Sequence, residues 1–416
     1  MVRESLVSQT VRERRGRTRL PRREHGQESQ RDPRSAFGGS SPARYRVKAL
    51  LIGGTGPTGP HIINGLLVRE YDVTLLHRGV HEPDGLPQVE HIHADPHFPE
   101  TLREAVAGRD FDVVVASYGR LRQIAEVFRG RCRQLVGIGG TPVYGGFVEP
   151  ENATPYGSRL LVREDGPLAD ASSPPSDFAM KLLSAERSLL DAAQSGAYQG
   201  TIVRYPQIYG PRNVIPWEWG VIKRVIDGRT RIILPDHGLW IQTRCAAANA
   251  AQAVLAVVDS PELADGRAFN CADRDQFTLR QWAELIVSML GRQVEFVGIP
   301  SDLAPSAFME LLAPQARPHM LVDAHAIRDV LGCEEVIGAR EALEETVAWL
   351  VEHPVSPEEY PAYPARFDYP AEDRLMDVYA RAQQQVRELA PDAPLEMVHA
   401  MAHPKKPGLG VDDRGR

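Results

Sequence analysis

Short apolar runs rich in β-branched residues alternate with longer amphipathic stretches from Arg46 onward. Strands separated by helices of about 10–15 residues are typical of right-handed βαβ units and a parallel sheet. The pattern therefore predicts an α/β fold, a Rossmann-type doubly wound parallel sheet. The strands expected are Ala49–Ile52, Val73–Leu76, a third ending at His91–Asp95, Val113–Val115, Leu135–Ile138 and Thr201–Val203. The helices expected between them are Pro57–Arg69, Pro99–Ala107, Leu121–Arg129 and Ser176–Ala193.

The alternation changes after Tyr209, where helices are joined by longer loops. Residues 46–210 are expected to form a nucleotide-binding Rossmann domain, and residues 211–352 a smaller α+β substrate lobe that partly returns to that domain. The lobe's expected elements are helices near Val221–Asp227, Ala246–Val258, Leu279–Leu290 and Arg340–Val351, and a strand at Val294–Val297.

Residues 353–416 begin as a Pro-rich tail and then show one amphipathic helical stripe. We expect this helix to pack on its own domain; a subunit contact, as in a homodimer, is the alternative. The stripe consists of Leu375, Tyr379, Ala382, Val386 and Leu389.

Charge is distributed unevenly along the chain. Residues 1–45 hold 11 Arg and 5 acidic residues, and the remainder carries a net charge of −13. Few apolar residues accompany the Arg, so this leader is expected to be disordered. A nucleic-acid arm or targeting peptide is one interpretation; a solvated tail, or a start codon placed too far upstream, is favoured. The acidic remainder argues against a nucleic-acid partner, because phosphate neutralisation needs a basic surface.

Membrane spans, disulfides and metal sites are not expected. No apolar run approaches the roughly 18 residues that a bilayer span requires. The four cysteines include no CxxC pair, which predicts reduced thiols in a cytoplasmic protein.

A glycine-rich turn follows the first predicted strand in VKALLIGGTGPTG, residues 47–59. Gly53 would allow a tight turn, Gly56 would let the backbone approach a pyrophosphate, and Gly59 would let the helix pack against its strand. The N-terminus of that helix would present unpaired N–H groups to the phosphates. The turn's candidate nucleotide-binding residues are Gly53, Gly54, Thr55, Gly56, Pro57, Thr58 and Gly59.

Further cofactor contacts are expected where other strands end. Arg78 stands where an acid would favour NAD, so NADP is preferred and NAD remains an alternative. Asp95 could accept a hydrogen bond from the adenine amino group. Ser117 and Tyr205, together with Lys181, complete the candidate set. A metal cluster of His91, His93 and His97 is conceivable, but a polar strand edge is favoured over it.

These segments resemble the extended or atypical short-chain dehydrogenase/reductase superfamily, in its NAD-dependent epimerase/dehydratase branch. The resemblance covers roughly residues 46–350. Besides the glycine turn it rests on GGTPVYG (139–145), on Lys181 in a helix, and on VRYPQIYGPRN (203–213). It implies an NAD(P) cofactor and a small-molecule substrate that carries a hydroxyl or carbonyl group.

The resemblance also implies a catalytic Ser or Thr, a Tyr, and a Lys four residues after that Tyr. Lys181 fits the Lys, but Asp177 stands in the Tyr position. Gly140 stands in the Ser/Thr position, with Thr141 one residue later. Asp177 could be a general acid or only the helical ion-pair partner of Lys181.

Other residues could complete the site. Tyr118 and Tyr144 are candidate substitute proton donors, each with a pocket wall as the alternative interpretation. Gln242 falls where the family often has an Arg for the substrate's phosphates, although Arg244 is close.

The function expected from the sequence is an NAD(P)-dependent oxidoreductase or epimerase/dehydratase-like enzyme with a non-standard proton donor. The departures at positions 140 and 177 also allow a catalytically silent NADP-binding sensor or scaffold. RNA binding, which some atypical members of the superfamily show, is the third alternative.

Overall fold

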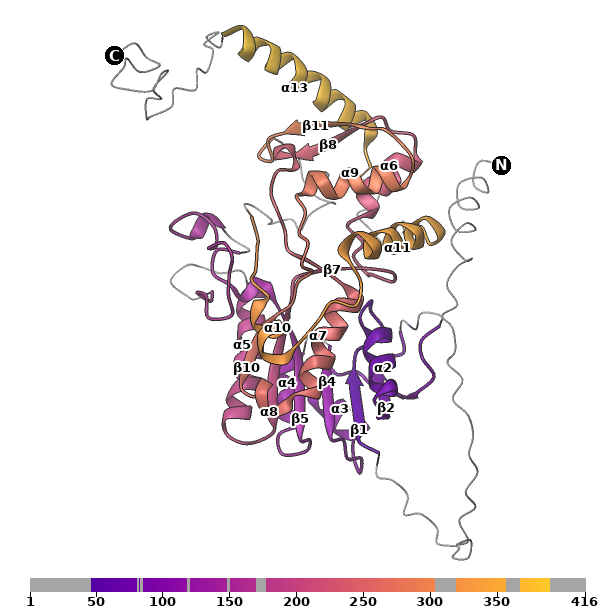
Figure 1. Cartoon of the computed structure of the whole chain (residues 1–416), viewed down its shortest axis with the longest axis vertical. Helices are drawn as coiled ribbons and strands as arrows, with labels where there is room; N and C mark the ends of the chain where they lie inside the picture. The colour runs from indigo at the N-terminus through magenta and orange to yellow at the C-terminus, as the bar shows by residue number, and fades with distance from the viewer. Residues whose placement is uncertain are drawn as a thin grey trace, which may run out of the picture. The chain divides into compact units, whose positions relative to one another are not determined.

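This computed structural model contains a seven-stranded parallel sheet, which lies in the lower part of Figure 1. The strand order is β10-β6-β5-β4-β1-β2-β3, and every pair in it is parallel. The predicted Rossmann-type α/β class is thereby confirmed. The structure describes residues 46–80, 82, 85–117, 120–147, 150–169, 177–303, 319–356 and 367–389. The strands are β1 (Lys48–Ile52), β2 (Asp72–His77), β3 (Glu90–His93), β4 (Val113–Ala116), β5 (Gln134–Gly140), β6 (Gln199–Tyr205) and β10 (Arg267–Asn270).

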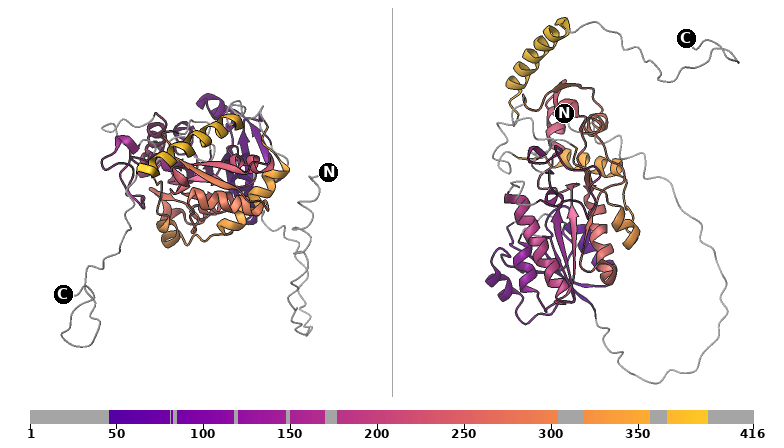
Figure 2. Two further views of the ribbon diagram at one scale, coloured as in Figure 1. Left: turned by 90° about the horizontal axis from the view of Figure 1, so that it is seen from above. Right: turned by 90° about the vertical axis from the view of Figure 1, so that its left-hand side faces the viewer.

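Helices cover both faces of the sheet, as the right-hand view of Figure 2 shows. One face packs against α2 (Gly59–Val68) and α7 (Ala247–Asp259), and the other against α3 (Pro99–Ala105), α4 (Leu121–Val127) and α5 (Asp177–Gln194). Strands buried on both faces need apolar side chains at consecutive positions rather than at alternate ones. The four residues of β4 are all fully buried, which explains why short apolar runs identified these strands.

The direction of strand addition reverses between β1 and β4. From β1 the chain proceeds to β2 and β3 on one side, and from β4 to β5, β6 and β10 on the other. In open α/β sheets, ligands bind outside the carboxyl ends of the strands at such a reversal. The glycine turn follows β1 and Ser117 follows β4, so these two segments flank that position.

A second core lies in the smaller lobe, around Tyr209, Trp282 and Leu343. Within the described residues, the lobe contains two pairs of parallel strands and three longer helices. These are β7 (Gln207–Tyr209) with β9 (Arg244–Ala246), β8 (Arg231–Pro235) with β11 (Glu295–Ile299), and α6 (Trp219–Ile226), α9 (Leu279–Met289) and α11 (Ala339–Glu352).

Part of the chain after residue 210 belongs to the sheet rather than to this lobe. There β10 is an edge strand, and α7, α8 (Pro261–Ala264) and α10 (His325–Leu331) pack beside the sheet. The expected domain boundary at residue 210 stays a prediction.

The last described helix, α13 (Tyr369–Leu389), packs through its first turns only. Met376 is buried against Ile233 and Ile299, and Glu372 is buried with Arg224. The prediction that this stripe packs on its own domain is therefore wrong for its second half, where Ala382, Val386 and Leu389 are exposed. The alternative, a subunit contact, stays a prediction. The first turns of α13 pack on the β8–β11 pair, which has only two strands, and a helix of 21 residues is longer than this surface. The last turns of α13 therefore contact no described surface.

None of the described helices is long and apolar enough to cross a bilayer. All four cysteines are unbridged, and burial raises the pKa of Cys132 to about 12 and that of Cys333 to about 11. The predicted leader, residues 1–45, lies outside the described residues.

Candidate nucleotide and substrate site

The glycine turn after β1 has a backbone that larger residues rarely adopt. Gly53 and Gly54 have φ angles of 94° and 79°, in the region where only glycine is unstrained. A Cβ on Gly59 would lie 1.7 Å from the Gly54 carbonyl oxygen, so α2 approaches the turn too closely for any side chain there. A Cβ on Gly56, in contrast, would meet no heavy atom within 4 Å. The turn is tight at both ends and has space over its middle glycine.

Neighbouring strand ends hold this turn in place. The Gly53 amide donates to the Leu76 carbonyl over 2.9 Å, and the Ser117 amide donates to the Ile52 carbonyl over 2.9 Å. A Cβ on Gly53 would lie 2.7 Å from the Ser117 carbonyl oxygen. Ser117 therefore lies against the turn, at the edge where its candidate cofactor role was expected.

The ends of β2 and β3 bring Arg78 near Asp95. The side chain of Arg78 is exposed. A backbone hydrogen bond from His97 lowers the pKa of Asp95, and the positive charge of Arg78 lowers it further. His97 also bonds the Asp95 carboxylate through Nδ1, over 2.7 Å. An exposed cation and an ionised carboxylate thus lie at the expected adenosine end of the site.

Tyr144 is fully buried, and its hydroxyl is committed to two neighbours. The hydroxyl donates to Asn270 Oδ1 over 2.7 Å and accepts from Arg204 Nη1 over 2.8 Å. Burial raises the pKa of Tyr144, although Arg204 acts in the opposite direction. A phenol so enclosed has no route to a substrate, which argues against Tyr144 as the proton donor.

Gly140 is the last residue of β5, and Thr141 follows it, beside the first turns of α5. A Cβ on Gly140 would lie 3.5 Å from Leu182 Cδ1, so this position faces the residue next to Lys181. Thr141 is buried and begins a short 3-10 helix (Thr141–Val143). Two of the segments that carry the family resemblance, GGTPVYG and the helix of Lys181, therefore meet here.

Asp177 and Lys181 lie on the first turns of α5, and both are exposed. The ion pair that their spacing suggested is not among those formed by the described residues. Lys181 is therefore available to a ligand. Tyr118, the remaining candidate phenol, lies outside the described residues.

A buried ion pair that the sequence did not reveal fixes α5 on the sheet. Arg204, in β6, contacts Glu186 over 2.9 Å, and their side chains are 4% and 2% exposed. Burial raises the pKa of Glu186, and the guanidinium of Arg204 limits that rise. Arg204 also donates to the Glu164 carbonyl oxygen over 3.2 Å. One side chain thus joins the sheet, α5 and the segment that contains Glu164.

Tyr205, the next residue of β6, lies beside the glycine turn. Its hydroxyl bonds the Ala250 carbonyl over 3.4 Å. Burial raises the pKa of Tyr205 well above its usual range, and a hydrogen bond with the Thr58 side chain opposes this. The phenol therefore contacts the residue that immediately precedes α2.

The lobe contains a buried cation with unused hydrogen-bonding capacity. Arg244 is 4% exposed, and its Nε and Nη2 have no partner among the described residues. The same holds for Gln242 Oε1 and for the side-chain amide of Gln207, which is paired with Arg244 in the β7–β9 register. Burial lowers the pKa of Arg244, and Glu218 acts in the opposite direction. Buried polar atoms normally have partners, so such a group marks a candidate ligand site.

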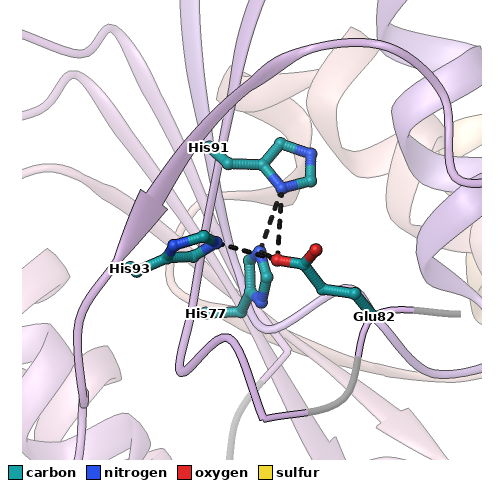
Figure 3. A group of neighbouring side chains, drawn as sticks. All are labelled: His77, Glu82, His91 and His93. Atoms are coloured by element: carbon teal, nitrogen blue, oxygen red, sulfur yellow. Dashed lines mark hydrogen bonds and ion pairs between the residues drawn. The ribbon is translucent and has the colours of Figure 1, made fainter.

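The histidines expected at one strand edge belong to a different set from the one predicted. His91 and His93 are joined by His77 and Glu82, while His97 bonds Asp95 instead (Figure 3). His77 and Glu82 were missed because only the pairing of β2 with β3 brings them to this edge. Of these four residues, only His91 and His93, spaced two apart on one strand, were recognisable in the sequence as possible neighbours in a cluster.

Comparison with known proteins supports the fold more strongly than any one activity. No family model matches the chain. A curated relative, UDP-N-acetyl-alpha-D-glucosaminuronate decarboxylase of Bacillus cytotoxicus, is 28% identical over 160 residues, which are 36% of this chain and 46% of the relative. The matched region thus spans about half the length of that relative.

Solved structures of nucleotide-sugar enzymes share the fold. The dTDP-glucose 4,6-dehydratase of Bacillus anthracis, in complex with NAD, has a TM-score of 0.57 and 17% identity, over 74% of this chain and 97% of its own. UDP-glucose 4-epimerase of Thermotoga maritima, with UDP-glucose, has a TM-score of 0.60 and 16% identity, over 74% and 99%. UDP-glucuronic acid 4-epimerase of Bacillus cereus, in complex with UDP-glucuronic acid and NAD, has a TM-score of 0.58 and 16% identity, over 74% and 100%.

Proposed function

We propose that this chain binds a nicotinamide dinucleotide at the carboxyl edge of its sheet. We further propose that it acts as an NAD(P)-dependent oxidoreductase or epimerase/dehydratase-like enzyme on a small molecule. The observation that carries the proposal is the glycine turn, with two left-handed glycines and space above Gly56 at the start of α2. The turn also lies beside Ser117, between the ends of β1 and β4, where the direction of strand addition reverses. Ligands bind at this position in open α/β sheets, which supports the proposal.

The chain's own groups would hold the two ends of such a cofactor. Backbone amides of the glycine turn before α2 would bind the pyrophosphate, because the turn lies at the positive end of the helix dipole. Arg78 and Asp95 would bind the adenosine end, and Lys181 the nicotinamide ribose. The cofactor would supply the hydride chemistry, with the protein orienting the substrate.

The substrate proposed is a small polyhydroxylated molecule with an anionic group. The buried cation Arg244, with two unused nitrogens, supports the anionic group. A guanidinium binds planar carboxylates and phosphates by two parallel hydrogen bonds. The sugar-nucleotide ligands of the solved relatives have this chemistry.

Proton transfer would use a donor other than the family's Tyr. Tyr144 is excluded from this proposal by its enclosure. Asp177, on the same helix as Lys181, and Tyr118 remain the candidates. Lys181 would place positive charge beside whichever of them acts.

Cofactor binding can be tested with two matched glycine replacements. Gly56→Leu should leave the fold intact, since nothing lies within 4 Å, and should weaken NAD(H) or NADP(H) binding at least about tenfold by filling the pyrophosphate position. Gly338→Leu, at an exposed glycine where an added Cβ would also have no neighbour within 4 Å, should leave the affinity unchanged. Calorimetric titration of both variants distinguishes them, and equal affinities would contradict the assignment of the turn.

Turnover is tested separately, by a screen of carbonyl and alcohol substrates followed through nicotinamide absorbance. Lys181→Ala should weaken cofactor binding and abolish turnover. Loss of turnover in only one of Asp177→Asn and Tyr118→Phe would identify the proton donor. Tight cofactor binding without turnover on any substrate would favour a silent NADP-binding sensor. Full activity in Lys181→Ala would refute the proposed mechanism.

A further inference from the structure

Three histidines and a glutamate converge at the edge of the sheet where β2 and β3 end (Figure 3). His77 is the last residue of β2, and its register partner is His93; His91 is paired with Leu75 two residues earlier. Alternate residues of a strand face the same side, so the parallel register places all three imidazoles on one face. Glu82 reaches them from the connection between the two strands.

The four donor atoms have nearly the spacing of a tetrahedral metal site. Zinc binds histidine nitrogen and carboxylate oxygen at about 2.0–2.1 Å, which puts tetrahedral donors about 3.3 Å apart. Here His77 Nε2 lies 3.1 Å from His91 Nδ1 and 3.2 Å from Glu82 Oε1. Glu82 Oε1 lies 2.8 Å from His93 Nε2 and 3.7 Å from His91 Nδ1. All four ligand atoms lie within 4.8 Å of one another.

The charges of these groups suit a cation rather than an anion. Glu82 offers a carboxylate oxygen, and the three histidines offer ring nitrogens, which are donor types that transition-metal ions bind. A carboxylate among the rings would repel a phosphate.

The present hydrogen bonds indicate what binding would change. The Gly79 amide donates to His77 Nδ1 over 3.2 Å, so in the metal-free form the proton of His77 is on Nε2. A metal at Nε2 would move that proton to Nδ1, and the Gly79 amide would turn away. Glu82, half exposed on a connection, would be the fourth ligand.

We propose that His77, His91, His93 and Glu82 form a site for a divalent transition-metal ion of the zinc class. Imidazole donors select zinc and its neighbours over magnesium or calcium. Four protein ligands leave no open position, so the site is structural, and the ion ties β2, β3 and their connection together. This metal site is independent of the proposed enzymatic activity.

The test titrates the full-length protein, without a histidine tag, with Zn²⁺ and separately with Co²⁺. We expect one ion per chain, an intense visible absorption from tetrahedral Co²⁺, and a higher melting temperature with Zn²⁺. His91→Ala and His93→Ala should each weaken Zn²⁺ binding at least about tenfold and abolish the Co²⁺ spectrum. Both side chains are partly exposed, so these variants should fold even if His77→Ala does not.

The control is His325→Ala, which removes an exposed histidine from α10, outside the cluster. It should retain the wild-type affinity and spectrum. Absence of stoichiometric binding, or affinity unchanged in both His91→Ala and His93→Ala, would overturn the proposal. Binding of inorganic phosphate that is lost in the same variants, with no binding of Zn²⁺, would overturn it in favour of an anion site.

Discussion

Replacing Glu186 by Gln would remove one charge from the buried ion pair that holds α5 on the sheet. Glu186 is 2% exposed and accepts three hydrogen bonds from Arg204, of 2.9–3.2 Å. Leaving one buried charge without its partner costs about 3–5 kcal/mol. Arg204 would keep its contacts with the Tyr144 hydroxyl and the Glu164 carbonyl, so we expect the lower end, about 3 kcal/mol.

The matched control is Glu284→Gln, which breaks the exposed pair with Arg280 on α9. Those side chains are 49% and 41% exposed, and such helical pairs contribute about 0.3–0.5 kcal/mol. Urea unfolding followed by circular dichroism would measure both free energies. For a chain of this size, with an unfolding entropy of about 2.1 cal/mol/K per residue, the Glu186→Gln loss corresponds to a fall of roughly 3–4 °C in melting temperature.

A double replacement separates lost charge pairing from lost packing. Glu186→Leu with Arg204→Met removes both charges, and we expect it to be more stable than Glu186→Gln alone, because no buried charge remains unpaired. Equal losses, within about 0.5 kcal/mol, for Glu186→Gln and Glu284→Gln would refute the reasoning. They would mean that the buried pair does not hold α5.

Three further predictions concern other parts of the chain. Arg78→Asp should reverse a preference for NADP(H) over NAD(H), because Arg78 would contact the 2′-phosphate. Calorimetry with both cofactors measures this preference. Tighter binding of NAD(H) than of NADP(H) by the wild type would show that Arg78 does not bind a 2′-phosphate. Glu372→Gln should destabilise the protein by about 3 kcal/mol in urea unfolding, since its ion pair with Arg224 is buried. Asp373→Asn should cost under about 1 kcal/mol, because in the ion pair of Asp373 with Arg229 the carboxylate is half exposed. A chain that begins at Tyr45 should melt within a few degrees of the full-length protein, because the leader has little apolar surface to bury; a large loss of stability would show that it contacts the rest.

Periodicity and turn chemistry were enough to predict the glycine turn and six of the seven strands of the sheet, but not the edge strand β10. Parallel strands are buried on both faces, so β1 and β4 appear as continuous apolar runs that need no tertiary information. The turn could be recognised because Gly53 and Gly59 occupy positions where a Cβ would be strained or would clash. Both the burial of these strands and the glycine requirement of the turn involve residues close together in the chain, so the sequence alone predicts them.

The remaining features depend on contacts between distant segments. Arg204 and Glu186 are 18 residues apart on different elements, and the enclosure of Tyr144 requires Asn270 from β10. The histidine cluster depends on the register of β2 against β3, which sequence spacing does not encode. The stripe on α13 was visible in the sequence, but where its contact surface ends was not.

A crystal structure of the protein with NAD⁺ or NADP⁺ would test the central claim most directly. We predict electron density for the pyrophosphate within hydrogen-bonding distance of the backbone amides of the glycine turn, over Gly56, with the nicotinamide ribose hydroxyls at Lys181 Nζ. Density elsewhere, or none at saturating cofactor in crystals whose glycine turn is exposed to solvent, would contradict the account.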